Sequence, residues 1–207
     1  MAITLNASTS SGLVQTADTS GTIDLQSAGA TKLSVTSTGT SIAQYNPSAS
    51  LITSGTAVAS TSGTSIDFTS IPSWVKRITV MFNGVSTNGT ANLLFRLGTS
   101  GGIASTGYSG RTSNIVSTTA NGNNDTIGFV MGSGASAADI FYGSIIFTNL
   151  NANIWCAQGS FSQIGATAFT TFPSGAISLS GTLTTVRITT GNGTDTFDAG
   201  SINILYE

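Results

Sequence analysis

Short runs of alternating apolar and polar residues decide what this chain can fold into. Residues 76–82 alternate in this way, and residues 91–97 do the same. A period of two is typical of a β-strand with one buried face. Asn-Gly steps at 83–84 and 88–89 lie between the two runs, and such steps favour tight turns. The sequence therefore predicts that the two runs pair as a β-hairpin.

Strand-like runs continue to the C-terminus, and we expect further strands at 140–150, 154–162, 176–180, 182–190 and 201–206. The run 140–150 is apolar on both faces, which is typical of a strand buried in the centre of a sheet or against a second subunit. Residues that favour helices are scarce in the sequence, and no stripe of apolar residues repeats at helical spacing. The sequence predicts an all-β fold whose main domain is a β-sandwich of jelly-roll-like form.

The first fifty residues differ in composition from the rest. They contain no Phe or Trp, and glycines separate short pairs of apolar residues. A segment of this kind is either disordered or packed on other chains, because alone it buries too little apolar area to offset its loss of entropy. The regular glycine spacing favours assembly. We expect an assembly segment of short β-strands over 1–43, a linker around Pro47 over 44–55, and a sandwich over 56–207.

Few residues carry charge, and this excludes several classes of partner. The 207 residues include only six Lys and Arg and eight Asp and Glu, for a net charge of −2. Six cations spread along the chain do not predict the basic face that nucleic-acid binding requires. No apolar run approaches the roughly 18 residues of a membrane-spanning helix. The N-terminal sequence also lacks the regions of a secretory signal peptide. We expect no nucleic-acid partner, no membrane span and no signal peptide.

Catalytic and metal-binding motifs are scarce as well. Histidine is absent, which excludes Ser-His-Asp triads and histidine metal sites. The closest pair of acids, Asp195 and Asp198, lies in a polar loop between two expected strands. The pair fits a hairpin turn that satisfies its own backbone, a calcium loop without EF-hand spacing, or a catalytic carboxylate pair, and we favour the turn. We expect that the protein is not an enzyme and that it has no catalytic residue and no cofactor. Asp195 and Asp198 are the candidate calcium ligands.

A candidate receptor site lies in residues 98–125, the longest stretch after the expected hairpin without a strong strand signal. It contains Tyr108 and Arg111, followed by Asn123 and Asp125. An aromatic face beside a cation, an amide and a carboxylate offers the stacking and hydrogen bonding that a surface glycan needs. These four residues are the predicted receptor contacts. The alternative is that they only satisfy the backbone of their own loop.

Two stretches resemble proteins of tailed bacteriophages. Residues 12–35, GLVQTADTSGTIDLQSAGATKLSV, resemble a segment near the N-terminus of tail-fibre and structural proteins of marine and cyanobacterial phages. Residues 68–90, FTSIPSWVKRITVMFNGVSTNGT, together with GYSG at 107–110, resemble a module of phage fibres. Both stretches lie in the first 110 residues, so the rest of the chain is not covered by the resemblance.

The resemblance implies a structural virion protein, made in the host cytoplasm and carried on the particle surface. It implies a short tail fibre, homotrimeric, whose intertwined N-terminal segments bind other virion proteins. The β-sandwich tips then face outward and bind a glycan or protein of the host cell surface. A capsid decoration or head-fibre protein is the alternative, and a polysaccharide-degrading tailspike is a third, less favoured candidate.

Overall fold

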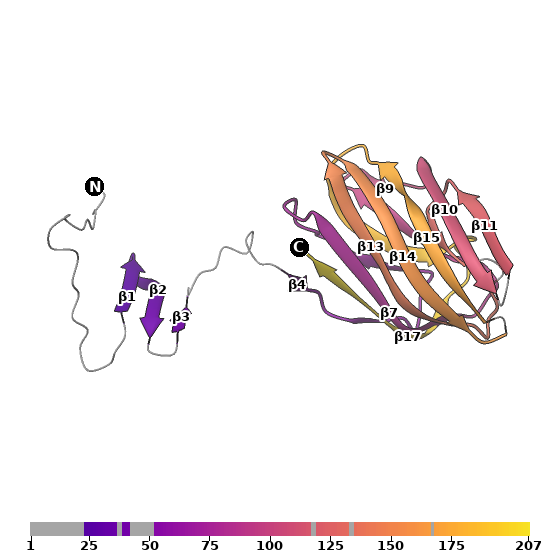
Figure 1. Cartoon of the computed structure of the whole chain (residues 1–207), viewed down its shortest axis with the longest axis horizontal. Coiled ribbons are helices and arrows are strands. Elements are labelled where there is room, and N and C mark those ends of the chain that lie inside the picture. The colour runs from indigo at the N-terminus through magenta and orange to yellow at the C-terminus, as the bar shows by residue number, and fades with distance from the viewer. Residues whose placement is uncertain (1–22, 37–38, 42–51, 117–118, 133–134, 167) are drawn as a thin grey trace. The chain divides into compact units, whose positions relative to one another are not determined.

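The computed structural model describes residues 23–36, 39–41, 52–116, 119–132, 135–166 and 168–207 (Figure 1). The chain divides into two compact units, residues 1–50 and 51–207. Every regular element in the described residues is a β-strand, which confirms the predicted all-β class. Most of the predicted linker, residues 44–51, lies outside the described residues, as does the stretch 1–22.

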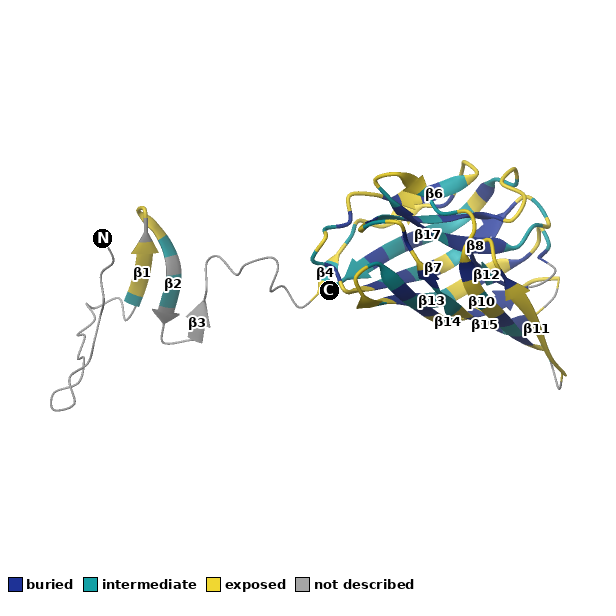
Figure 2. Ribbon diagram, turned by 90° about the horizontal axis from the view of Figure 1, so that it is seen from above, coloured by how far each residue is buried: buried dark blue, intermediate teal, exposed yellow. Residues whose placement is uncertain are grey.

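The N-terminal unit contains one small antiparallel sheet, in the order β1 (Ile23–Ser27), β2 (Ala30–Thr36) and β3 (Gly39–Ser41). Ile23 pairs with Val35 and Leu25 pairs with Leu33, so apolar positions of β1 and β2 share one face of the sheet. Leu25 is 45% exposed, and no side chain described in this unit is buried (Figure 2). A three-stranded sheet of this size therefore has no core of its own.

The C-terminal unit is a sandwich of two antiparallel sheets. The large sheet has the order β11 (Thr119–Asp125), β10 (Tyr108–Val116), β15 (Phe169–Ser178), β14 (Ile154–Ile164), β13 (Ile140–Asn151), β7 (Arg77–Thr87), β17 (Phe197–Tyr206) and β4 (Thr53–Ser54), with β5 (Val58–Ala59) also beside β17. The small sheet has the order β12 (Phe129–Met131), β8 (Leu93–Thr99), β16 (Leu183–Thr190) and β6 (Ser65–Phe68), with β9 (Gly102–Ile103) beside β8. Since β4 lies in residues that the sequence assigned to the linker, the sandwich begins earlier than expected.

Apolar side chains from both sheets meet in a single core. Its centre is aromatic: the ring of Phe95 in the small sheet lies 5.5 Å from Phe82, 5.7 Å from Phe161 and 6.0 Å from Phe147, all three in the large sheet. Ring separations in this range are favourable, and each ring also buries a large apolar area. These contacts join the two sheets face to face, which confirms the β-sandwich.

The predicted hairpin between residues 76–82 and 91–97 is wrong. β7 pairs with β13 and β17 in the large sheet, whereas β8 pairs with β12, β16 and β9 in the small sheet. The first Asn-Gly step lies inside β7, where Gly84 has a φ of +68° and the register with β17 shifts. An Asn-Gly step supplies positive φ equally well to a bulge and to a turn, so the local pattern could not distinguish them.

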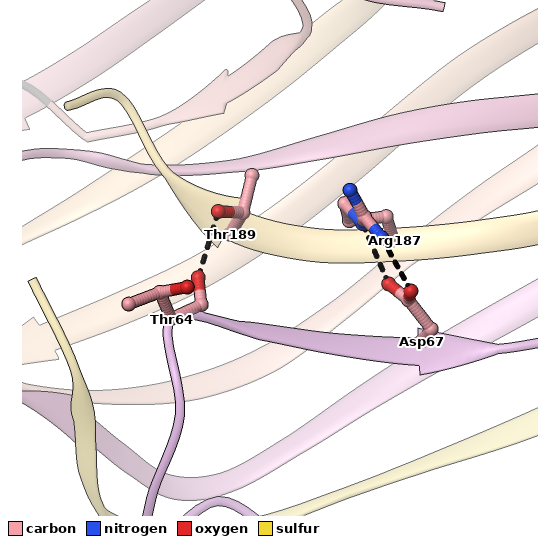
Figure 3. Close-up of polar contacts among 4 residues, drawn as sticks. All are labelled: Thr64, Asp67, Arg187 and Thr189. Carbon is pink, nitrogen blue, oxygen red and sulfur yellow. Dashed lines mark hydrogen bonds and ion pairs between the residues drawn. The ribbon is translucent and has the colours of Figure 1, made fainter. Parts of the chain in front are cut away.

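Polar contacts fix the short edge strand β6 to the small sheet (Figure 3). Arg187 lies directly opposite Asp67, and its guanidinium donates to both carboxylate oxygens, at 2.7 and 2.6 Å. The Thr189 hydroxyl donates to the carbonyl of Thr64, at 2.8 Å. The ion pair is partly exposed, so it contributes about 0.2–1 kcal/mol and mainly fixes the register of the edge strand.

Candidate functional site

The predicted receptor loop over residues 98–125 is largely strand. β9, β10 and β11 occupy most of it, and β10 and β11 pair with each other at one edge of the large sheet. The core-facing positions of β10 include Thr112 and Asn114, which are polar yet buried. Polar residues at inward positions remove the alternation of apolar and polar side chains, which is why the sequence showed no strand there.

Tyr108 is a core residue and not a loop contact. Its side chain is 3% exposed and meets Phe129 edge to face, with ring centroids 5.0 Å apart. The backbone N–H of Leu97 donates to the Tyr108 hydroxyl at 2.8 Å, and that hydroxyl donates to the carbonyl of Ala104 at 3.0 Å. Burial raises the pKa of Tyr108 to about 12. The expectation of an exposed ring for a ligand is therefore wrong.

Asp125 is also buried, at 8% exposed. The hydroxyl of Thr112 donates to one of its carboxylate oxygens at 2.6 Å. Burial raises the pKa of Asp125, and the hydrogen bond from Thr112 opposes that shift only in part. The expectation that this carboxylate lies on an exposed loop is therefore wrong, because Asp125 is a largely buried residue of β11.

Arg111 and Asn123 are exposed, but they lie on opposite faces of the β10–β11 pair. Arg111 is paired with Asn124 and its guanidinium donates to the Asn124 side chain at 3.0 Å. Asn123 is paired with Thr112, whose side chain points into the core. The four predicted receptor residues therefore do not form one site. Figure 2 shows β11 at the edge of the sheet, and every residue of this strand except Asp125 is exposed.

The calcium candidates Asp195 and Asp198 are separately engaged. Asp195 accepts hydrogen bonds from the Asn192 side chain at 2.7 Å and from the backbone N–H of Ala91 at 2.9 Å, and these bonds lower its pKa. Asp198 accepts a hydrogen bond from the hydroxyl of Ser86. The described residues contain no group of three or more His, Cys, Asp or Glu side chains that could hold a metal ion. The favoured hairpin turn is correct only in part: the Asn192 side chain accepts hydrogen bonds from the backbone N–H groups of Thr194 and Asp195, but the segment joins β16 and β17 of different sheets, and neither Asp accepts from the backbone of the turn in these contacts.

A cavity of about 220 Å³ lies at one end of the sandwich, and no pattern in the sequence indicated it. Its lining comes from the loop before β7, the β13–β14 turn and the start of β16: Ile71, Pro72, Ser73, Val75, Lys76, Asn149, Ala152, Asn153, Thr182 and Leu183. Trp155, which is 4% exposed, also lines it. An amphipathic lining of this kind is typical of small-ligand sites.

Asn149 organises the rim of this end cavity. Its side-chain N–H₂ group donates to the carbonyls of Ala152, at 3.0 Å, and Ile154, at 3.1 Å. Its side-chain oxygen accepts a hydrogen bond from the ammonium of Lys76, at 3.3 Å. The ion pairs of the described residues are Arg77–Glu207 and Arg187–Asp67, so Lys76 presents a cation at the cavity that no described carboxylate neutralises.

Comparison with known proteins identified no relative of this chain. No protein-family model, no curated protein and no solved structure matches the chain. No membrane-spanning helix occurs in the part of the chain that the structure describes. The candidate functional features are thus the end cavity around Lys76 and Trp155 and the surfaces of the two units.

Proposed function

We propose that this protein is a structural component of a tailed-bacteriophage particle. It is a short, homotrimeric fibre in which the N-terminal unit attaches to other virion proteins and the sandwich contacts the host cell. The observation that carries the proposal is the difference between the two units. The sandwich has a complete core, whereas the described part of the N-terminal unit has none. A unit without a core needs other chains to bury its apolar positions, as an attachment segment does.

The resemblance to phage proteins supports the same function. Residues 12–35 and 68–90 carry it, and the second stretch supplies Ile71 and Lys76 of the end cavity as well as strand β7. Of the first stretch, residues 12–22 lie outside the described residues, and residues 23–35 form β1 and most of β2.

The end cavity is the host-contact site within this proposal, in place of the Tyr108 region. Lys76 offers an ammonium, the neighbouring loops offer Asn and Ser or Thr side chains, and Trp155 offers an apolar wall. A sugar residue bearing a carboxylate matches all three, because its charge meets Lys76 while its ring carbons meet the indole. The cavity is smaller than the roughly 300–1,000 Å³ of drug-sized pockets, so one sugar unit fills it.

Electron cryomicroscopy of purified particles tests the proposed function directly. We expect density for this chain as a three-fold assembly on the tail, with the sandwich farther from the particle than the N-terminal unit. Density on the capsid would show that the protein is a capsid decoration protein and not a tail fibre. Absence of the chain from the particles would refute both forms of the proposal.

Binding to host cells tests the end cavity. We expect Lys76→Ala to lose most adsorption of the purified protein to host cells, while Arg111→Ala, which removes an exposed cation elsewhere, adsorbs normally. Equal adsorption of both variants would exclude the end cavity as the host-contact site. Loss with Arg111→Ala alone would move the site to the β10–β11 edge.

A further inference from the structure

Half of the large apolar side chains that are exposed in the described residues lie at one end of one surface. These are Ile115 at 49% exposed, Ile140 at 38%, Tyr142 at 41%, Ile164 at 55% and Phe172 at 37%. We call them the apolar patch. They come from β10, β13, β14 and β15, which are consecutive strands of the large sheet and lie side by side in Figure 1.

The strand register makes the apolar patch continuous. Ile140 lies directly opposite Ile164. Tyr142 pairs with Ser162, Ser162 pairs with Thr170, and Thr170 pairs with Ile115, so these four residues form one row across the four strands. The residues between the large side chains are small and uncharged, so a partner surface can approach the backbone closely.

All five side chains point away from the core. Their neighbours along the strands, among them Phe141, Gln163 and Thr171, are buried in the sandwich, and successive strand residues point to opposite faces. The apolar patch is therefore the outward surface of the large sheet. Monomeric proteins rarely leave several large apolar side chains together in water, and such patches mark interaction surfaces.

Charge restricts what can cover the apolar patch. Among the outward positions of these four strands, Arg111 is the one charged residue, and it already donates to Asn124. A partner therefore needs an apolar, uncharged, flat surface. The patch itself is such a surface, and copies of the chain can meet there without opposing like charges.

The N-terminal unit points to the same kind of partner. The face that Ile23, Leu25 and Leu33 share on β1 and β2 also has no described side chains that bury it. A second copy of the chain brings an equivalent apolar surface for each of these two faces.

We propose that the apolar patch is a contact between copies of this chain, with the same patch of each copy meeting around the symmetry axis. The apolar patch lies wholly on the sandwich, and the contact holds or fails whether or not the chain belongs to a phage particle.

Cysteine crosslinking in the full-length protein tests this contact. The variant carries Ile164→Cys together with Cys156→Ser, because Cys156 is the only native cysteine and is half-buried. The matched control carries Leu150→Cys in the same background: Leu150 is 66% exposed and lies at the other end of β13. Both variants are treated with a short bis-maleimide at micromolar chain concentration and separated on a denaturing gel.

We expect crosslinked chains from Ile164→Cys at a yield at least about tenfold above the control, since an interface holds thiols at millimolar effective concentration. Complete reaction with a single maleimide but no crosslinking above the control would overturn the proposal. If circular dichroism shows that Ile164→Cys is unfolded, Phe172→Cys in the same background gives the same test.

Discussion

The two units of this chain differ in how far their described apolar side chains are buried. In the sandwich, Phe95, Phe129, Phe147 and Phe161 are at most 1% exposed, and rings from both sheets meet in one core. In the N-terminal unit, Leu25 is 45% exposed and no described side chain is buried. The described parts of both units are β-structure, but the first fifty residues contain no Phe or Trp. The difference shows that strand pairing alone does not make an autonomous unit, because a second apolar layer is also required.

The largest effect should come from removing the centre of the core. Phe95→Ala should lower the free energy of unfolding by about 3–5 kcal/mol, because the deletion leaves a cavity among three other rings. Chemical denaturation followed by circular dichroism measures the loss. Leu33→Ala in the N-terminal unit is the matched control and should leave the unfolding midpoint of the sandwich unchanged. Equal effects of the two variants would contradict the division into independent units.

A smaller loss should follow from Tyr108→Phe. The change keeps the ring against Phe129 but leaves the N–H of Leu97 and the carbonyl of Ala104 without the hydroxyl that they share. Buried polar groups left unpaired cost about 1–3 kcal/mol, measurable by thermal unfolding. If Tyr108 were a surface contact, its hydroxyl would be free in water and the variant would unfold like the original protein.

Much of the fold was predictable from the sequence because burial in a sandwich follows the strand period. The runs at 140–150, 154–162 and 182–190 were predicted as strands, and they form β13, β14 and β16. Pairing was not predictable, since β8 joins a different sheet from β7 and its main partner, β16, lies far along the chain. An Asn-Gly step indicates a residue with positive φ, but it does not indicate which strand the following residues pair with.

The candidate site was harder to predict than the fold. Glycines beside Tyr108 indicated a loop, but its ring occupies a core position that only tertiary packing creates. The end cavity brings together Lys76, Asn149 and Trp155, which come from separate segments of the chain. The apolar patch had a partial signal, because the run 140–150 was apolar on both faces and left a second subunit as one explanation.

The pH dependence of stability tests the role of Asp125. Burial raises the pKa of this carboxyl above its unfolded value, so the folded state binds the proton more tightly. The free energy of unfolding that this group contributes should therefore fall as pH rises from the unfolded pKa through the raised folded pKa. Asp125→Asn should remove that decline, as measured by denaturation between acid and neutral pH. A decline that persists unchanged in the variant would exclude Asp125 as its source.

Salt should have the smallest effect. The chain has few charges and its apolar patch has none, so the proposed contacts between copies would rest on apolar burial and backbone pairing. Raising the salt to about 1 M shortens the screening length to about 3 Å and should leave the oligomer intact in sedimentation. Dissociation by salt alone would show that ion pairs hold the copies together.

Removal of the N-terminal unit tests most directly whether the sandwich folds by itself and whether the N-terminal unit provides the attachment. A chain that begins at Leu51 keeps β4 and the whole core. It should show a β-type circular dichroism spectrum and unfold cooperatively at the same denaturant midpoint as the sandwich of the full-length protein. It should no longer attach to particles. A shortened chain that is unfolded, or one that still attaches to particles, would contradict the account.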